Sequence, residues 1–305
     1  MHEEVLDQLT TLRDYVRYAI SRFNAAELFF GHGTSGALDE AAALVLHALH
    51  LPYDLPGGYF QSVLTTDERK QVLELIERRI KERQPLAYLT HEAPFAGHQF
   101  YVDERVLVPR SPIAELIEAE FTPWVEPERV TRILDLCTGS GCIAIACALA
   151  FPDAQVDAVD ISVEALEVAD INRRRLDVEG RVRSVCSDLF VGLKGERYDI
   201  IVSNPPYVSL AEWQSLPQEF HAEPRLGLES GPDGLDCVRR ILAEASEHLN
   251  EDGILVVEVG SAAEALVRAF PDVPFCWLEF ERGGDGIFLL TAEQVRAFFG
   301  KQGSA

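Results

Sequence analysis

From about residue 130 onwards, short apolar runs rich in β-branched residues alternate with segments of helical composition. Helical segments begin near Gly141, Ser162, Leu235 and Ser261. The runs have the length and character of buried strands, and they are RILDL (132–136), QVDAVDI (155–161), RVRSVCS (181–187), YDIIVSN (198–204), GILVVEVG (253–260), FCWLEFE (275–281) and GIFLLT (286–291). This order predicts a doubly wound α/β fold with a mainly parallel sheet and an antiparallel pair of strands at its end.

The chain before residue 86 has a different pattern, because its apolar positions recur at helical spacing. Residues 5–23 are amphipathic, and residues 38–51 have helix-forming composition. A third helix is predicted after a Thr65-x-x-Glu68 capping box. This part contains no evident catalytic cluster, which favours a role in recognition.

Residues 86–112 are aromatic and β-branched with turn residues interspersed, which is typical of a hairpin. We therefore predict three parts in the chain. A helical recognition domain covers residues 1–85, a β-hairpin linker covers 86–112, and the α/β domain covers 113–305.

The charge and composition of the chain restrict the kinds of molecule that it is expected to bind and the compartment in which it is expected to work. The net charge is −23, from 50 acidic and 27 basic residues. Such a chain repels phosphate backbones, which disfavours DNA and favours a basic protein or a cationic small molecule. No apolar stretch reaches membrane-spanning length and the N-terminus is acidic, so we expect a cytoplasmic protein without a membrane partner. The six cysteines form no CxxC pair, which indicates reduced thiols and no metal site.

The loop after the first strand contains Gly139 and Gly141, which allow the backbone to turn tightly and approach a ligand. Asp160 ends the second strand, where a carboxylate can accept both hydroxyls of a ribose. Asp188 ends the third strand, near where an adenine would lie. These positions predict a nucleoside site. The pattern from Gly139 to Ala144 also fits the dinucleotide fingerprint, so an NAD enzyme is an alternative on these residues alone.

The fourth strand ends in Asn204-Pro205-Pro206-Tyr207. Ligands of a doubly wound sheet lie outside the carboxyl ends of the strands, so this turn should face the same crevice as the glycine loop. The Asn204 amide oxygen and the Pro205 carbonyl could together accept both hydrogens of an NH₂ group, and Tyr207 could pack against a planar group. We interpret the turn as a site that orients an amide or aromatic amine towards an electrophile. A hydride-transfer enzyme has no evident use for it.

These motifs together resemble the HemK/PrmB family of protein-(glutamine-N5) methyltransferases, which belongs to the class I S-adenosylmethionine methyltransferases. The resemblance covers nearly the whole chain and includes PLAYLTHEAPFAGHQFYVDERVLVPR (85–110), DLCTGSGCIAIA (135–146) and EPRLGLESGPDGLD (223–236). The turn NPPY alone is shared with adenine-N6 DNA methyltransferases, whereas the linker and Glu223-Pro224 indicate this family. The sequence after the linker, Pro109-Arg110-Ser111-Pro112, is similar to the PrmB branch, which methylates large-subunit ribosomal protein three.

The resemblance implies an S-adenosyl-L-methionine site, with S-adenosyl-L-homocysteine as product. Together with Asp188, the expected cofactor contacts are Cys137, Thr138, Gly139, Ser140, Gly141, Asp160, Leu189 and Asn204. The turn from Asn204 to Tyr207 is expected to hold the substrate glutamine, and the implied partner is a basic ribosomal protein of the large subunit. A monomer is compatible with the sequence.

Three alternatives remain open on the sequence. The first is the sister activity on peptide chain release factors. The second is an adenine-N6 methyltransferase, which would need a basic target-reading region that this acidic chain lacks. The third is a non-catalytic ribosome-assembly factor that keeps a nucleoside pocket. The role of Glu223-Pro224 is also open, between ordering the substrate loop and capping a turn.

Overall fold

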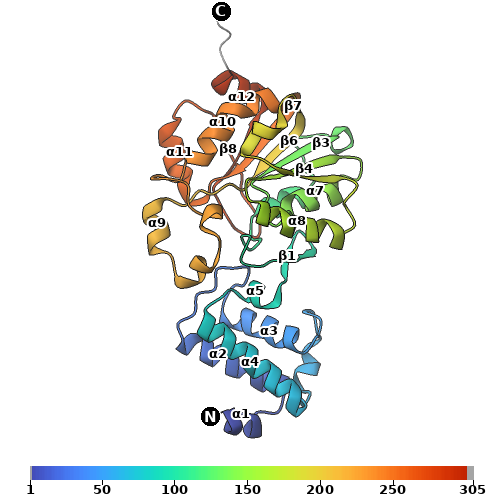
Figure 1. Cartoon of the computed structure of the whole chain (residues 1–305), viewed down its shortest axis with the longest axis vertical. Coiled ribbons are helices and arrows are strands. Elements are labelled where there is room, and N and C mark those ends of the chain that lie inside the picture. Colours follow the sequence, from blue (N-terminus) through green and yellow to red (C-terminus); the bar gives the residue numbers. More distant parts are fainter. Residues whose placement is uncertain (1, 301–305) are drawn as a thin grey trace, which may run out of the picture. The chain divides into compact units, whose positions relative to one another are not determined.

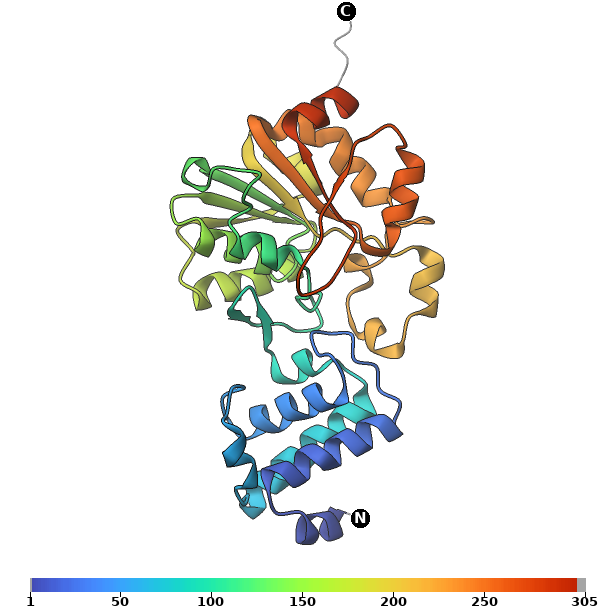
Figure 2. The same cartoon turned by 180° about the vertical axis from the view of Figure 1, so that it is seen from behind.

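A computed structural model describes residues 2–300 of the chain (Figures 1 and 2). It divides into two compact units. The helical unit contains the chain up to Glu92 together with Pro217–Ala222, and the α/β unit contains Ala93–Leu216 and the chain from Glu223 onward. The predicted linker, 86–112, therefore contributes to both units, and the predicted end points at 1 and 305 lie outside the described residues. Within residues 2–300, none of the helices is both long and apolar enough to cross a membrane.

The helical unit is built from amphipathic helices whose apolar faces share one core. Its elements are α1 (His2–Gln8), α2 (Leu12–Ala25), α3 (Ala37–Ala48), η1 (Gly57–Gln61), α4 (Thr66–Glu82), α5 (Leu86–Thr90) and η4 (Gln218–Ala222). The predicted capping box is confirmed, because the Thr65 N–H donates to Glu68 at 2.7 Å and the Glu68 N–H donates to the Thr65 hydroxyl at 3.4 Å. Helix α5 was not expected, since all its side chains are buried and it therefore shows no amphipathic pattern.

A buried charge cluster joins distant parts of the helical unit. The Arg79 Nε donates to Glu40 at 2.6 Å, and both side chains are buried. Glu219 belongs to the short segment Pro217–Ala222 and is also fully buried. Its Oε1 lies 2.8 Å from an Arg83 guanidinium nitrogen and accepts the Phe29 N–H at 3.1 Å. Because buried charges require partners, these contacts fix the segment to the helices.

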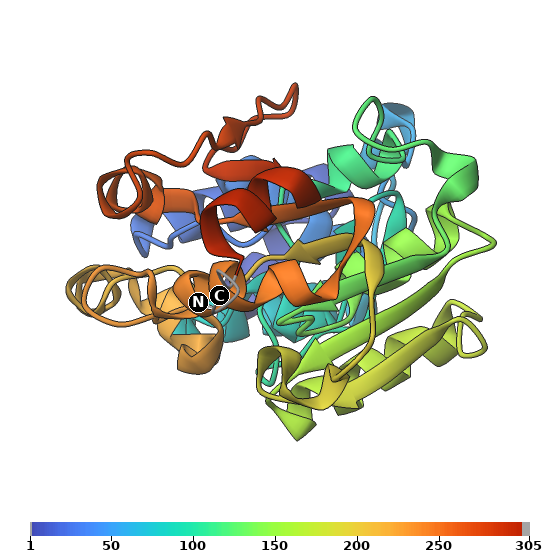
Figure 3. The ribbon, with the colours of Figure 1, turned by 90° about the horizontal axis from the view of Figure 1, so that it is seen from above.

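The α/β unit begins with a small hairpin and continues into a seven-stranded sheet. Its elements are β1 (Ala93–Phe95), β2 (His98–Phe100), α6 (Ile113–Glu118), η2 (Pro127–Arg129), β3 (Arg132–Leu136), α7 (Cys142–Ala150), β4 (Gln155–Asp160), α8 (Val163–Arg175), β5 (Val182–Cys186), η3 (Leu189–Leu193), β6 (Tyr198–Ser203), α9 (Leu210–Ser215), η5 (Arg225–Gly227), α10 (Asp236–His248), β7 (Leu249–Glu258), η6 (Gly260–Ala262), α11 (Ala263–Ala269), β8 (Cys276–Trp277), β9 (Ile287–Thr291) and α12 (Ala292–Phe299). Figure 3 shows these elements from above.

The strand order is β5-β4-β3-β6-β7-β9-β8. Strands β3 to β7 pair in parallel, whereas β9 runs antiparallel to β7 and β8. The predicted fold class is therefore confirmed. The predicted strand at 275–281 is shorter in the structure, where only Cys276–Trp277 pairs with β9.

Successive residues of each central strand face opposite sides of the sheet. Ile133 packs into the core that contains α6 and α7, and its neighbour Leu134 packs into the core that contains α10 and α12. Both faces are covered, which explains why these strands are continuous apolar runs in the sequence. The strand order changes direction between β3 and β6, so their carboxyl ends mark the switch point of the sheet.

Candidate active site

A cavity of about 460 Å³ opens at the carboxyl ends of the central strands. Most of the predicted site residues line it, namely Cys137, Thr138, Gly139, Ser140, Asp160, Asp188, Leu189, Asn204 and Pro206. Gly141, Pro205 and Tyr207 are not part of the lining. The volume is that of a small-molecule site, and its position is the one expected for a ligand of a doubly wound sheet.

The loop between β3 and α7 turns sharply around a buried carboxylate. Asp135 is fully buried, and its Oδ2 accepts the Thr138 hydroxyl at 2.5 Å and the Ala144 N–H at 3.1 Å. Burial raises the pKa of Asp135 to about 7. Gly139 and Gly141 have φ values of +54° and +78°, a region that glycine adopts without strain. The turn therefore places the Gly139 backbone on the cavity wall.

Asp160 lies at the end of β4 with both carboxylate oxygens oriented by backbone donors. The Gly139 N–H donates to Oδ2 and the Ser162 N–H donates to Oδ1, each at 2.9 Å. Burial raises the pKa of Asp160, and these hydrogen bonds oppose the rise. Each oxygen retains a further lone pair, so the carboxylate can accept two adjacent hydroxyl groups from a ligand in the cavity.

The third strand end supplies Asp188 and Leu189, which line the cavity next to helix α10. The Asp188 carboxylate lies 2.8 Å from an Arg240 guanidinium nitrogen. Arg240 also lines the cavity and was not expected from the sequence, which shows it only as one charged position of a helix. The ion pair fixes the Asp188 side chain at the rim of the cavity.

The turn after β6 holds Asn204 at the switch point. Ser203 ends the strand, and its hydroxyl donates to the Leu136 carbonyl of β3 at 2.7 Å. Asn204 follows and lines the cavity, and its side chain makes no hydrogen bond within residues 2–300. Its carboxamide is therefore available to a ligand. Tyr207 instead directs its hydroxyl to Glu258, to which it donates at 2.9 Å.

Comparison with known proteins agrees with this geometry. The family model described as methyltransferase small domain matches residues 121–234. The ribosomal protein uL3 glutamine methyltransferase of Xanthomonas campestris is 54% identical over 291 residues, covering 95% of this chain and 94% of that protein. The enzymes of the same description from Neisseria meningitidis and Francisella tularensis are 52% and 47% identical, over 97% and 96% of this chain and 97% and 94% of their own lengths.

The chain belongs to the family of ribosomal protein uL3 glutamine methyltransferases. The resemblance inferred from the motifs, including the branch within the family, is therefore confirmed. The NAD alternative is excluded by the same finding, because these relatives are methyltransferases.

Within this family member, Glu223 has a clear structural partner. Its carboxylate is bound by the Arg110 guanidinium and accepts the Val108 N–H at 2.9 Å. Arg110 and Val108 belong to the cavity-lining stretch 105–111, and Pro224 lines the cavity as well. Of the two roles left open for Glu223, the contacts favour the ordering of the loops around the cavity. Arg110 was visible in the sequence only as part of the family motif.

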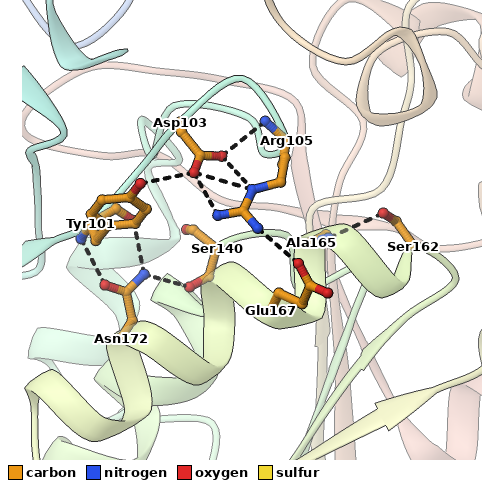
Figure 4. Close-up of polar contacts among 8 residues, drawn as sticks. All are labelled: Tyr101, Asp103, Arg105, Ser140, Ser162, Ala165, Glu167 and Asn172. Carbon is orange, nitrogen blue, oxygen red and sulfur yellow. Dashed lines mark hydrogen bonds and ion pairs between the residues drawn. The ribbon is translucent and has the colours of Figure 1, made fainter. Parts of the chain in front are cut away.

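A second polar network connects the chain after the hairpin to the glycine loop (Figure 4). The buried Asn172 of α8 accepts the Tyr101 N–H at 2.7 Å and donates to the carbonyls of Tyr101 and Ser140, each at 2.9 Å. Nearby, Arg105 binds Asp103 with distances down to 2.6 Å. Asn172 was missed from the sequence, where the one signal is an amide on the apolar face of a helix.

Proposed function

We propose that this protein transfers a methyl group from S-adenosyl-L-methionine to the side-chain nitrogen of a glutamine in ribosomal protein uL3. The observation that carries the proposal is the available Asn204 carboxamide, which lines the same cavity as the Gly139 backbone and Asp160. Membership of the family supplies the substrate class. The relatives' descriptions name uL3 and glutamine.

The residues around the cavity fit the proposed methyl donor. A Cβ added at Gly139 would meet no atom within 4 Å, so the space beside this backbone is open for a ligand. Asp160 would accept the ribose hydroxyls, and Asp188 with Leu189 would border the adenine. S-adenosyl-L-methionine supplies an electrophilic methyl group on its sulfonium and leaves as S-adenosyl-L-homocysteine.

The turn after β6 would orient the substrate amide. The Asn204 Oδ1 and the Pro205 carbonyl each accept one hydrogen of the glutamine NH₂ group, which directs its nitrogen towards the methyl group. An amide nitrogen is a poor nucleophile, so most of the rate enhancement must come from positioning and from the exclusion of water. A new N–C bond forms as the S–C bond breaks, and one proton leaves the nitrogen to water.

The net charge of −23 supports a basic protein as partner. Ribosomal proteins bind RNA and are rich in lysine and arginine, so an acidic enzyme attracts one at long range before it joins a ribosome. We therefore propose that the reaction takes place in the cytoplasm, before the substrate joins a ribosome. Raising the ionic strength should increase KM for uL3, and an unchanged KM would contradict the electrostatic part of the proposal.

A direct test uses labelled methyl donor with purified uL3 and, separately, with a peptide chain release factor. We expect label on a uL3 glutamine, which mass spectrometry of the digested product would locate. Label only on the release factor would assign the sister activity instead. In the Asn204→Ala variant, we expect methylation to be lost while calorimetry shows the affinity for S-adenosyl-L-methionine largely retained. Inert wild-type protein would contradict catalysis.

A further inference from the structure

Glu258 is a carboxylate that directly follows the apolar run 254–257 of β7. It ends β7 within the sequence ILVVEVG, and only 6% of its surface is exposed. A buried carboxylate requires hydrogen-bond donors, and Glu258 has one on each oxygen. Its Oε1 accepts the Tyr207 hydroxyl at 2.9 Å, and its Oε2 accepts the Ser111 hydroxyl at 2.5 Å.

The two donors come from two separate segments of the chain, and each segment contains residues that line the cavity of the proposed reaction. Tyr207 ends the turn that begins with Asn204, whereas Ser111 belongs to the cavity-lining stretch 105–111. Ser111 is itself buried, and its hydroxyl oxygen also accepts the Ile113 N–H at 3.2 Å. Glu258 is therefore the common partner of the turn and of the stretch 105–111.

Two glycines pack closely against Tyr207, and a third supports one of them. A Cβ at Gly260 would lie 2.6 Å from the Tyr207 ring, and a Cβ at Gly234 would lie 2.1 Å from the Tyr207 carbonyl oxygen. Gly286 in turn approaches the Gly260 backbone, since its Cβ would come within 2.6 Å of it. These glycines belong to the motifs SGPDGLD, VVEVG and GGDGIFLLT, and none of the three glycines lines the cavity.

The chemistry of Tyr207 and Glu258 favours a hydrogen bond in which the proton stays on the tyrosine and is not transferred to the glutamate. Burial and the neighbouring Glu258 raise the pKa of Tyr207, so its phenol stays protonated and donates. Burial also raises the pKa of Glu258, while the two hydroxyl donors and Arg110 oppose this rise. Tyr207 does not line the cavity, so its hydroxyl acts on the site through the backbone of the turn.

We propose that Glu258 is a positioning residue for methyl transfer, because it holds the turn from Asn204 to Tyr207 at a fixed distance from the Ser111 side of the cavity. This inference rests on the proposed function. Since Asn204 and the Pro205 carbonyl must both meet one NH₂ group, a small displacement of the turn would weaken the alignment of the amide nitrogen more than substrate binding. Loss of the bond should therefore lower kcat and leave KM nearly unchanged.

The test compares Glu258→Gln, Tyr207→Phe and the double variant with uL3 as substrate. We expect each single variant to lower kcat by about tenfold to a hundredfold, with KM for uL3 and the affinity for S-adenosyl-L-methionine retained. If the two residues act as one unit, the double variant is no slower than the slower single variant. Glu264→Gln is the matched control, because Glu264 pairs with Arg268 at 3.4 Å on the exposed surface of α11.

The outcomes separate this inference from the proposed function. Wild-type kcat in either single variant, or losses that multiply in the double variant, would overturn the role of Glu258. Should Glu258→Gln fail to fold, Tyr207→Phe decides alone, since it removes only one hydroxyl. A wild-type protein that leaves uL3 unmethylated would contradict the proposed function and the role of Glu258 with it.

Discussion

The Arg110 guanidinium donates to both carboxylate oxygens of Glu223, with N–O distances of 2.6 and 2.8 Å. The Glu223 side chain is completely buried, whereas Arg110 is 22% exposed. Such a two-point contact fixes orientation as well as distance. It connects residues 105–111 with the loop that follows Glu223, and both stretches line the cavity.

The first prediction concerns the geometry of this pair. Arg110→Lys keeps the positive charge but replaces the planar fork with a single ammonium group, which cannot bind both oxygens in the same way. We expect kcat/KM for uL3 to fall by about tenfold or more, because the loops lose their alignment. Steady-state kinetics with labelled methyl donor measure the change.

Glu223→Ala is the stronger variant of the same pair, since it leaves Arg110 without its carboxylate. We expect the free energy of unfolding to fall by about 3 kcal/mol, measured by urea titration.

Arg268→Lys is the control for Arg110→Lys, because Arg268 and Glu264 form an exposed pair at 3.4 Å on α11 that should contribute little. Equal effects of Arg110→Lys and Arg268→Lys on kcat/KM would contradict the ordering role of the buried pair.

The second prediction separates the two glycines of the loop after β3. A Cβ at Gly139 would meet no protein atom within 4 Å, whereas a Cβ at Gly141 would lie 3.1 Å from the Ala169 Cβ. Both have positive φ, so alanine costs about 1–2 kcal/mol of backbone strain at either position. Gly141→Ala adds a steric clash and should be less stable than Gly139→Ala, which thermal unfolding measures.

The affinity for S-adenosyl-L-methionine should respond in the opposite order, with a larger loss in Gly139→Ala than in Gly141→Ala. Gly139 lines the cavity and Gly141 does not, so the methyl group of Gly139→Ala occupies space that the proposed donor requires. Calorimetry with S-adenosyl-L-methionine should show at least about a tenfold weaker affinity for Gly139→Ala than for folded Gly141→Ala. The reverse order would place the donor away from the Gly139 backbone.

The sequence made part of this site predictable because strand ends are easy to recognise. Gly139, Asp160 and Asn204 each come shortly after or at the end of an apolar run, and parallel strands bring their carboxyl ends to one edge. The fold class was predictable for the same reason. Continuous apolar runs and helical spacing reflect local geometry and burial, which a single chain segment displays.

The supporting residues could not be located in this way. Arg110 and Glu223 meet across more than a hundred positions, and Asn172 contacts Tyr101 from another element. Their pairing depends on how distant parts of the chain pack together, and such packing produces no periodic pattern of residues in the local sequence. Glu258 did leave a signal, since a carboxylate directly after a buried apolar run demands partners, but the sequence does not identify Tyr207 and Ser111 as those partners.

The third prediction is a pH dependence of stability that originates at Asp135. Its ordinary pKa of 3.8 is raised to about 7 by burial. The folded protein therefore keeps a proton that the unfolded chain releases, and the contribution of this group to stability decreases as the pH rises from about 4 to about 7. Asp135→Asn removes this titration and retains an acceptor for Thr138 and Ala144. Its melting temperature relative to wild type should be higher at pH 8 than at pH 5.

Asp199→Asn provides a control of opposite sign. Hydrogen bonds from Thr131, Asn250 and Arg132 lower the pKa of Asp199, although burial acts in the other direction. Its stabilising effect is present above its ordinary pKa and is lost only as the pH falls below about 4. The difference in melting temperature between Asp199→Asn and wild type should therefore stay constant from pH 5 to pH 8. A constant difference for Asp135→Asn would contradict the buried titration.

The last prediction concerns Glu219, which holds Pro217–Ala222 within the helical unit. Its carboxylate contacts Arg83 at 2.8 Å and accepts the Phe29 N–H at 3.1 Å, and Arg79 lies 3.8 Å away. Glu219→Gln keeps the shape but removes the charge, so two guanidinium groups lose a buried counter-charge. We expect the helical unit to lose about 3 kcal/mol of stability.

Hydrogen exchange followed by mass spectrometry measures this loss segment by segment, because local opening determines the rate. Peptides that cover α4 and Pro217–Ala222 should exchange faster in Glu219→Gln, whereas peptides from β3 and β6 should be unchanged. Glu82→Gln is the matched control, since Glu82 pairs with Arg78 on the exposed face of α4 at 3.3 Å. If Pro217–Ala222 exchanges at the wild-type rate in Glu219→Gln, the segment is held by its apolar contacts, such as Phe220 against Phe29 at 5.4 Å between ring centroids, and not by the buried charge.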